Sequence, residues 1–276
     1  SESGGIRDPH IYRGPDGGFY LAMTDLHIYA QRDGYRDTEW ERDGKTYGWG
    51  NNRGLVLMKS FDLIHWTRTN IRFDQMSKEF AQIGCAWAPE TVYDPVTGRM
   101  MIYFTMRFGT EQNRLYYVYV NQDFNRIESI PQILFEYPSG ASAIDGGITP
   151  IWNEERQKME YHLFYVAHES GSGIKQAVSD RIDGGYRFDP RWIDFEPVAC
   201  EAPNVWKRIG EDKWVLMYDI FGINPHNFGF VETSDFVHFK NLGRFNEGVM
   251  KTTNFRSPKH GAVIHLTQEE ADRLEN

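Results

Sequence analysis

The feature that most constrains the fold of this chain is a succession of short apolar runs separated by turn residues. The runs are rich in β-branched and aromatic residues, which is typical of strands rather than helices. The clearest of them occupy residues 19–23, 54–58, 101–104, 115–120, 161–166, 214–218 and 262–266. The best helix signal is the capping box Thr267-Gln268-Glu269-Glu270. We therefore predict a protein that is nearly all β.

These runs recur in groups. In three places a first strand passes through a turn of Gly, Asp or Pro into a strongly apolar strand, which predicts a hairpin. The turns lie at residues 15–18, 94–98 and 210–212, and third strands close on short polar motifs at residues 59–66, 120–124 and 233–239. Four-stranded units repeated in this way predict the blades of a β-propeller, because radial repetition leaves only short, protected sheet edges.

Acidic or imidazole residues stand immediately before the first strand of each predicted blade. They are Asp8, Glu90, Asp145, Glu201 and His260. The first strands of a propeller line its central channel, so we expect these five side chains to converge in a single domain spanning residues 1–276. Five such residues predict a five-bladed β-propeller, and the long first interval indicates an insertion at residues 26–52.

The fifth blade is predicted to be incomplete within this chain. After His260 only one further strand and the short helix remain. Natural β proteins avoid unfilled strand edges. We therefore expect the missing strands to come from a segment upstream of Ser1, from another copy of the chain or from a separate fragment.

Composition excludes several classes of function. The chain has 30 Lys and Arg against 39 Asp and Glu, a net charge of -9, and no basic run, which argues against nucleic-acid binding. No apolar stretch approaches the roughly 18 residues of a membrane span. Two cysteines, Cys85 and Cys200, are too few for a disulfide framework, so free, buried thiols are expected. The first residues lack the pattern of a signal peptide, and removal of a leader would be compatible with a secreted or periplasmic location.

Carboxylates directed into one channel have a chemical consequence. A single Asp in the setting Arg7-Asp8-Pro9 can be a simple turn former. Several carboxylates in one pocket repel one another unless one is protonated or paired, and this separates the pKa values of an acid and a base. Hydrolysis of a glycosidic bond requires such a pair.

The motifs around these residues resemble those of glycoside hydrolase family 43 in order and spacing over essentially the whole chain. They are Ile6-Arg7-Asp8-Pro9-His10, Trp87-Ala88-Pro89-Glu90, Ile144-Asp145-Gly146-Gly147, Cys200-Glu201-Ala202-Pro203 and Lys259-His260-Gly261. The resemblance implies a five-bladed propeller and an inverting mechanism. It also implies that Asp8 is the general base, that Glu201 is the general acid, and that Asp145 raises the pKa of the acid and orients it.

Two further points follow from the resemblance. His260 matches a histidine that in many members contacts a calcium ion or its water shell, so a structural calcium in the channel is expected, while the chemistry requires no cofactor. Ala202 departs from the family, in which a glycine commonly follows the acid.

Aromatic residues are candidates for a sugar-stacking wall. We predict that Trp49, Trp87 and Trp206 contact substrate, with core packing as the alternative for each. Arg53 and Glu90 complete the predicted substrate-binding set. The part of the insertion that holds residues 47–53 is the best candidate for a rim that blocks one end of the site and makes the enzyme exo-acting.

The sequence thus predicts an inverting, exo-acting glycoside hydrolase. The expected product is a terminal pentose, with α-L-arabinofuranose favoured, released from plant-type polysaccharide side chains or oligosaccharides. A β-D-xylosidase and a galactan-directed hydrolase of the same fold are the alternatives. A non-catalytic carbohydrate-binding propeller and a glycoside phosphorylase are two further classes that the residues leave open.

Overall fold

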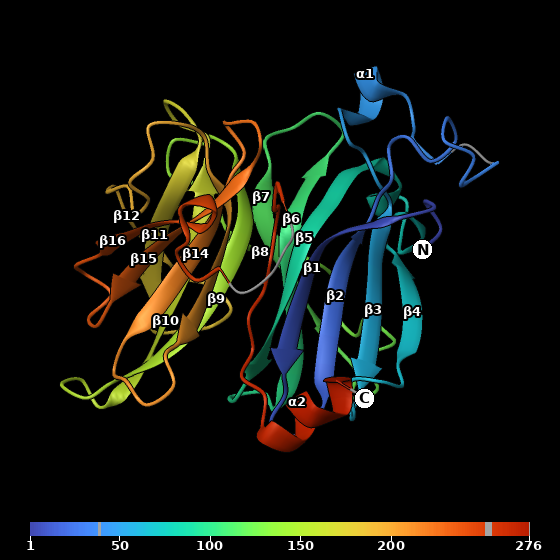
Figure 1. The fold of residues 1–276 in the computed structure, drawn as a ribbon. Helices are drawn as coiled ribbons and strands as arrows, with labels where there is room; N and C mark the ends of the chain where they lie inside the picture. Colours follow the sequence, from blue (N-terminus) through green and yellow to red (C-terminus); the bar gives the residue numbers. More distant parts are fainter. Residues whose placement is uncertain (38–39, 252–255, 276) are drawn as a thin grey trace. The chain divides into compact units, whose positions relative to one another are not determined.

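The computed structural model describes residues 1–37, 40–251 and 256–275 (Figure 1). The chain forms two compact units, one of Ser1–Ile133 with Ile264–Asn276 and the other of Leu134–Val263. In the described residues, the strands form four four-stranded sheets, and each sheet follows chain order from its first strand to its fourth. Such antiparallel four-stranded sheets are the units from which propellers are built.

The first unit contains two of these sheets. One consists of β1 (Ile6–Arg13), β2 (Phe19–Asp25), β3 (Gly54–Ser60) and β4 (Thr67–Arg72). The other consists of β5 (Ile83–Asp94), β6 (Arg99–Phe108), β7 (Arg114–Val120) and β8 (Gln132–Phe135), whose last residues lie at the boundary of the unit. The first strands β1 and β5 are neighbours, and the Tyr12 hydroxyl accepts a hydrogen bond of 3.2 Å from the Tyr93 amide. Fully buried side chains such as Leu57, Phe73 and Phe104 fill the core between the two sheets.

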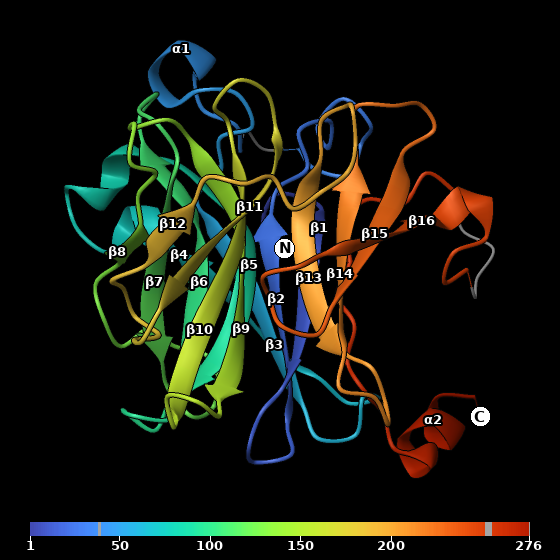
Figure 2. The ribbon, with the colours of Figure 1, turned by 90° about the vertical axis from the view of Figure 1, so that its left-hand side faces the viewer.

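The second unit repeats this arrangement. Its sheets consist of β9 (Ala143–Asn153), β10 (Lys158–Ala167), β11 (Gly173–Ser179) and β12 (Arg187–Asp189), and of β13 (Glu201–Lys207), β14 (Trp214–Ile220), β15 (Asn227–Thr233) and β16 (Lys240–Arg244) (Figure 2). The first strands β9 and β13 are again in contact. Phe164, Tyr218 and Val231 are fully buried in the core that joins the sheets.

Two short α-helices accompany the sheets in the described residues. Helix α1 (Gly44–Tyr47) lies in the predicted insertion, and α2 (Gln268–Glu275) begins at the predicted capping box. In that box the Thr267 amide donates to Glu270 and the Glu270 amide donates to the Thr267 hydroxyl. Glu270 also binds Arg13 of β1 at 2.5 Å, which fixes α2 on the first unit (Figure 1). No described helix has the length and apolar character needed to cross a bilayer.

Most predictions made from local patterns are confirmed. Six of the seven apolar runs lie within strands, and Cys85 and Cys200 are both buried thiols that form no disulfide in the described residues. The polar motifs that close two third strands also fold alike. Asp62 accepts hydrogen bonds from the Ile64 and His65 amides, and Asp235 accepts them from the Val237 and His238 amides.

The prediction of a fifth blade is not confirmed, because the described residues form four sheets rather than five. The strand predicted at residues 262–266 is wrong, since this segment has no strand pairing. Within the segment the Val263 amide donates to the Asn204 side chain at 3.0 Å, and just before it the His260 amide donates to the Asp219 carboxylate at 3.2 Å. For these two donors a side-chain oxygen takes the place of a strand partner.

Candidate active site

The first strand of every sheet contains the same backbone irregularity. A residue with a left-handed backbone stands where the pairing register shifts, and its φ is 51° at Asp8, 42° at Ala88, 52° at Asp145 and 54° at Ala202. Such bulges bend the strand and re-aim its side chains. His260, with φ 41°, continues the series. Positions 88, 145, 202 and 260 are spaced more evenly than the predicted set 90, 145, 201 and 260, so Glu90 and Glu201 flank the repeated position rather than occupy it.

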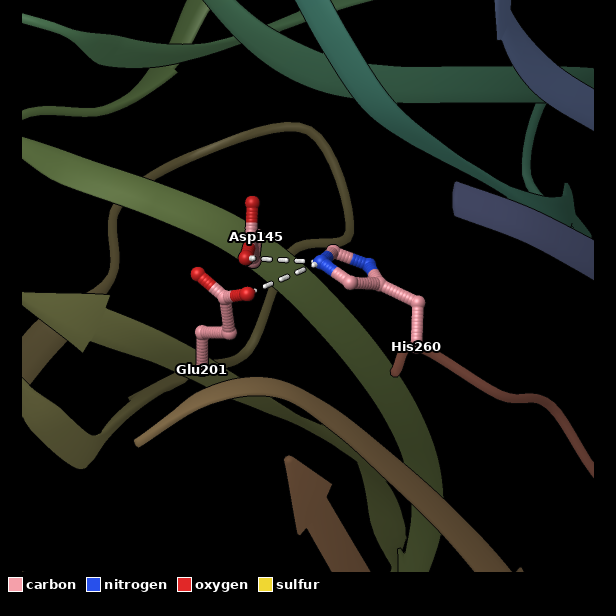
Figure 3. A group of neighbouring side chains, drawn as sticks. All are labelled: Asp145, Glu201 and His260. Atoms are coloured by element: carbon pink, nitrogen blue, oxygen red, sulfur yellow. Dashed lines mark ion pairs between the residues drawn. The ribbon is translucent and has the colours of Figure 1, made fainter. Parts of the chain in front are cut away.

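Three of the predicted residues converge in the second unit. His260 Nε2 lies 3.8 Å from Asp145 Oδ2 and 3.6 Å from Glu201 Oε1. Figure 3 shows the two carboxylates side by side with the imidazole facing both. The side chains of Asp145, Glu201 and His260 are 7%, 15% and 13% exposed, so the cluster is shielded but reachable. The structure therefore brings the predicted acid, the predicted orienting carboxylate and the histidine into one group.

Two charged residues that the sequence analysis did not single out complete this group. Lys259 Nζ lies 2.5 Å from Glu201 Oε1 and 3.9 Å from Asp219 Oδ2. Asp219 pairs with Glu201 across β13 and β14 and is fully buried, and its Oδ1 has no hydrogen-bond partner in the described residues. Lys259 thus lies between two carboxylates on adjacent strands.

These contacts shift the pKa values of both carboxylates. Burial raises the pKa of Glu201, but the hydrogen bonds and charges of His260 and Lys259 outweigh it and lower the pKa to about 2. Burial is also the largest influence on Asp219 and raises its pKa to about 6, because the Glu201 charge adds to burial and Lys259 only partly opposes it. The predicted acid is therefore held ionised, and the proton-retaining carboxyl of the pair is Asp219.

The cluster of Asp145, Glu201 and His260 is the candidate for the expected calcium site. The three side chains place ligand atoms within 4.8 Å of one another. Calcium takes six to eight oxygen ligands, whereas this set contributes an imidazole nitrogen and has the Lys259 ammonium against one carboxylate. The donor set therefore fits calcium poorly.

The predicted base, Asp8, lies in the first unit. Its Oδ2 accepts a hydrogen bond of 2.8 Å from the Thr24 hydroxyl, which itself accepts one of 2.8 Å from the Ala88 amide. Arg7 Nε lies 3.9 Å from Asp8 Oδ1. Thr24 therefore ties the bulge of β1 to the bulge of β5 and holds the carboxylate in place. The separation of Asp8 from Glu201, which belongs to the other unit, stays a prediction.

Glu90 is engaged in a buried polar network of the first unit. The Tyr103 hydroxyl donates to Glu90 Oε2 at 2.8 Å, and His10 Nε2 lies 3.6 Å from the same oxygen. Burial lowers the pKa of His10 to about 3, so this histidine is neutral, and its Nδ1 accepts from the Thr91 amide at 3.2 Å. These contacts of Glu90 and His10 stabilise β5 and β6. The role of Glu90 in substrate binding stays a prediction.

Two of the three candidate tryptophans lie together in the first unit. The rings of Trp49 and Trp87 are 6.2 Å apart in an edge-to-face arrangement, and Trp49 is 70% exposed. The guanidinium of Arg107 lies 4.7 Å over the Trp87 ring and donates to the Trp49 carbonyl at 2.9 Å. Arg53 lies over the Trp40 ring, at 5.2 Å from its centroid, and its role in substrate binding stays a prediction.

Trp206 lies in a different environment. It packs with the apolar cluster on β13–β16 and lines a cavity of about 640 Å³ together with Met217, Phe228 and Phe230. Lys259 and His260 line the same cavity. Trp206 is partly buried in this cavity wall, and its contact with substrate stays a prediction.

A comparison with known protein families identifies this chain. A family model described as "Probable glycosyl hydrolase domain", of the family 43-related type, matches residues 1–272. The chain belongs to the family 43-related glycosyl hydrolases. The predicted resemblance to family 43 and the prediction of a glycoside hydrolase are confirmed by this match.

Relatives of this glycosyl hydrolase differ in their recorded activities. An α-L-arabinofuranosidase of Bifidobacterium longum subsp. longum is 26% identical over 121 residues, 41% of this chain but 10% of that protein. A thermostable family-43 glycoside hydrolase has a TM-score of 0.58 at 17% identity, covering 86% of this chain and 72% of its own. A putative exo-β-1,3-galactanase from Bifidobacterium bifidum s17 has a TM-score of 0.58 at 11% identity, covering 89% and 72%. These structural matches confirm the all-β propeller fold.

The residues that the sequence analysis of this hydrolase missed share a recognisable signal. Asp219 is a carboxylate inside the otherwise apolar strand β14, and a buried charge in such a strand needs a partner. Lys259 directly precedes His260 in the recognised motif. Thr24 has no such signal, because a threonine in a strand is ordinary.

Proposed function

We propose that this domain is an inverting, exo-acting glycoside hydrolase that releases terminal α-L-arabinofuranose from plant-type polysaccharide side chains or oligosaccharides. The observation that carries the proposal is the convergence of Asp145, Glu201 and His260 at the bulged starts of β9 and β13 and at the segment after β16. The arabinofuranosidase match favours the pentose. The galactanase match makes a galactan-directed activity the second candidate, and a β-D-xylosidase remains the third.

The proposed reaction uses the chain's own carboxyl groups. Glu201 donates a proton to the glycosidic oxygen, and the bond from that oxygen to the anomeric carbon breaks. Water attacks the anomeric carbon from the opposite face while Asp8 accepts the water's proton, so the released sugar has the inverted configuration. Asp145 orients the acid through the group that it shares with His260.

The acid role places a requirement on Lys259. Glu201 has its pKa lowered by His260 and Lys259, so little of it is protonated in the free protein near neutral pH. The proposal therefore requires that bound substrate weakens the contact between Lys259 and Glu201, which lets the buried carboxyl regain a proton.

Two further parts of the proposal concern the surroundings of the site. The insertion with the exposed Trp49 forms the rim that limits the enzyme to chain ends. The enzyme acts in a secreted or periplasmic location, where plant-type polysaccharides are met.

Turnover of 4-nitrophenyl pentosides and galactosides tests the substrate. We expect the α-L-arabinofuranoside to be the best substrate, and NMR of the first-formed sugar to show the inverted anomer. Retention of configuration would contradict the mechanism. Turnover that depends on inorganic phosphate would show a phosphorylase, and binding of oligosaccharides with no turnover would show a binding propeller.

A further inference from the structure

A groove in the second unit adjoins the segment that leads into the strand of the predicted acid, and it has no role in the reaction described so far. Its volume is about 430 Å³, and it is lined by residues 170–173 at the start of β11 and by Trp192, Asp194 and residues 196–199 between β12 and β13. The Cys200 amide donates to the Ser172 carbonyl at 3.1 Å. Because Cys200 directly precedes Glu201, the wall of the groove is joined to the strand that presents the acid.

One wall of the groove is a fixed aromatic ring. Trp192 is 44% exposed, and Lys175 Nζ lies 4.4 Å from its ring centroid. The Tyr137 hydroxyl accepts a hydrogen bond of 2.8 Å from the same ammonium, so the cation is itself held in place. A Cβ at Gly173 would lie 3.0 Å from carbon atoms of the ring, which explains why the ring packs against a glycine. The exposed ring is thus supported from below rather than free to turn.

The remaining lining of the groove is polar. Within the described residues, no hydrogen bond engages the hydroxyl of Ser170 or Ser172. Asp194 accepts hydrogen bonds from the Ile174 amide at 2.7 Å and the Glu196 amide at 3.1 Å, which orients its carboxylate at the groove. A rigid aromatic face beside hydroxyl and carboxylate groups matches a sugar ring, which has an apolar face and a rim of hydroxyls.

We propose that this groove binds a sugar residue on the leaving-group side of the substrate, stacked on Trp192. The inference rests on the proposed function. If Glu201 protonates the leaving group of the substrate, that group lies next to the residues that adjoin Glu201. It extends that function by assigning the ligand: an oligosaccharide that continues beyond the bond to be cleaved. Trp192 is then a specificity-determining residue that favours oligosaccharides over simple glycosides.

Binding measured without turnover tests this inference. In a Glu201→Gln background, titration calorimetry would use α-1,5-arabinotriose, xylotriose and β-1,3-galactotriose as probes. We expect Trp192→Ala to weaken binding of the best probe at least tenfold and Trp192→Phe to weaken it less. Trp152→Ala is the matched control, because Trp152 is 47% exposed on the same unit but near the far end of β9 from Asp145. This control should bind as the parent does.

The outcomes separate the groove from the reaction. Equal affinity of Trp192→Ala and its parent would overturn the inference, as would equal weakening by Trp152→Ala or failure of all three probes to bind. Circular dichroism and thermal unfolding verify that each variant is folded. Binding that depends on Trp192 in a protein that hydrolyses none of the probes would support the groove and reject the proposed function. Hydrolysis with no dependence of affinity on Trp192 would do the reverse.

Discussion

Replacing Lys259 by methionine should change the pH at which the enzyme works. The substitution keeps an unbranched apolar stem, one atom shorter than that of lysine, but removes the charge that lies 2.5 Å from Glu201 Oε1. An opposite charge this close lowers a carboxyl pKa by about 1 to 3 units, so its removal should raise the pKa of Glu201 by about that amount. Each unit is a tenfold increase in the protonated fraction of Glu201 at any pH above its pKa.

The assay is the pH profile of kcat/KM, which reports groups of the free enzyme. For a general acid the basic limb marks its pKa, so this limb should move up by about 1 to 3 pH units in Lys259→Met. Lys259→Arg keeps the charge and serves as the matched control, with the limb in place. A basic limb that does not move in an active Lys259→Met enzyme would refute the role of Lys259 in setting the charge of Glu201.

Stability provides an independent measure of the same contact. The pKa of Glu201 is depressed on folding, so its ion pair stabilises the protein above the unfolded value of about 4.3. That contribution is lost as the pH falls toward 2, the folded value. The difference in unfolding free energy between the parent and Lys259→Met should therefore shrink over this window.

Three other changes test neighbouring parts of the site. Glu201→Gln should lower turnover of an oligosaccharide by about 10² to 10⁴, with a smaller loss on an activated aryl glycoside that needs no proton, and equal losses would show that Glu201 is not the acid. The raised pKa of Asp219, about 6, means that the parent loses stability as the pH rises from about 4 to 6; Asp219→Asn should remove this loss of about 3 kcal/mol in denaturant unfolding, and an unchanged pH dependence would contradict the assignment. Ala202→Val should destabilise by about 1 to 3 kcal/mol, because a β-branched residue is strained at φ 54°, whereas Ala202→Gly should differ from the parent by less than about 1 kcal/mol; similar unfolding of the two variants would argue against the left-handed bulge.

The sequence predicted those parts of the fold that depend on local patterns. Short apolar runs identified most strands. The Ser60-Phe61-Asp62 turn is formed by hydrogen bonds between residues close in the sequence. The segment at residues 262–266 is also apolar but forms no strand, and its Val263 amide donates to the Asn204 side chain rather than to a neighbouring strand. A local apolar pattern does not determine which hydrogen-bond partner a backbone amide will have.

The candidate site was predictable in its residue types but not in its charge state. The motifs located Asp145, Glu201 and His260, and the structure brings them together. The contact of Lys259 with Glu201 joins residues far apart in the chain, and no local pattern reports it. In two of the sheets the repeated left-handed position is occupied by an alanine, Ala88 or Ala202, which has no ionisable side chain. The spacing of the acidic residues therefore did not reveal this position.

The bulges explain how residues at different positions of the repeat can meet. Asp145 stands at the left-handed position of β9, whereas Glu201 stands one residue before that of β13. In regular strands neighbouring residues face opposite sides of the sheet, so this offset would send one of the two carboxylates away from the other. The register shift between Glu201 and Asn204 breaks that alternation, and the extra methylene of glutamate adds reach. Both carboxylates consequently arrive within 4 Å of the same nitrogen of His260. A repeat that holds only a backbone conformation constant can thus place an aspartate, a glutamate and a histidine in one site, each free to differ in chemistry.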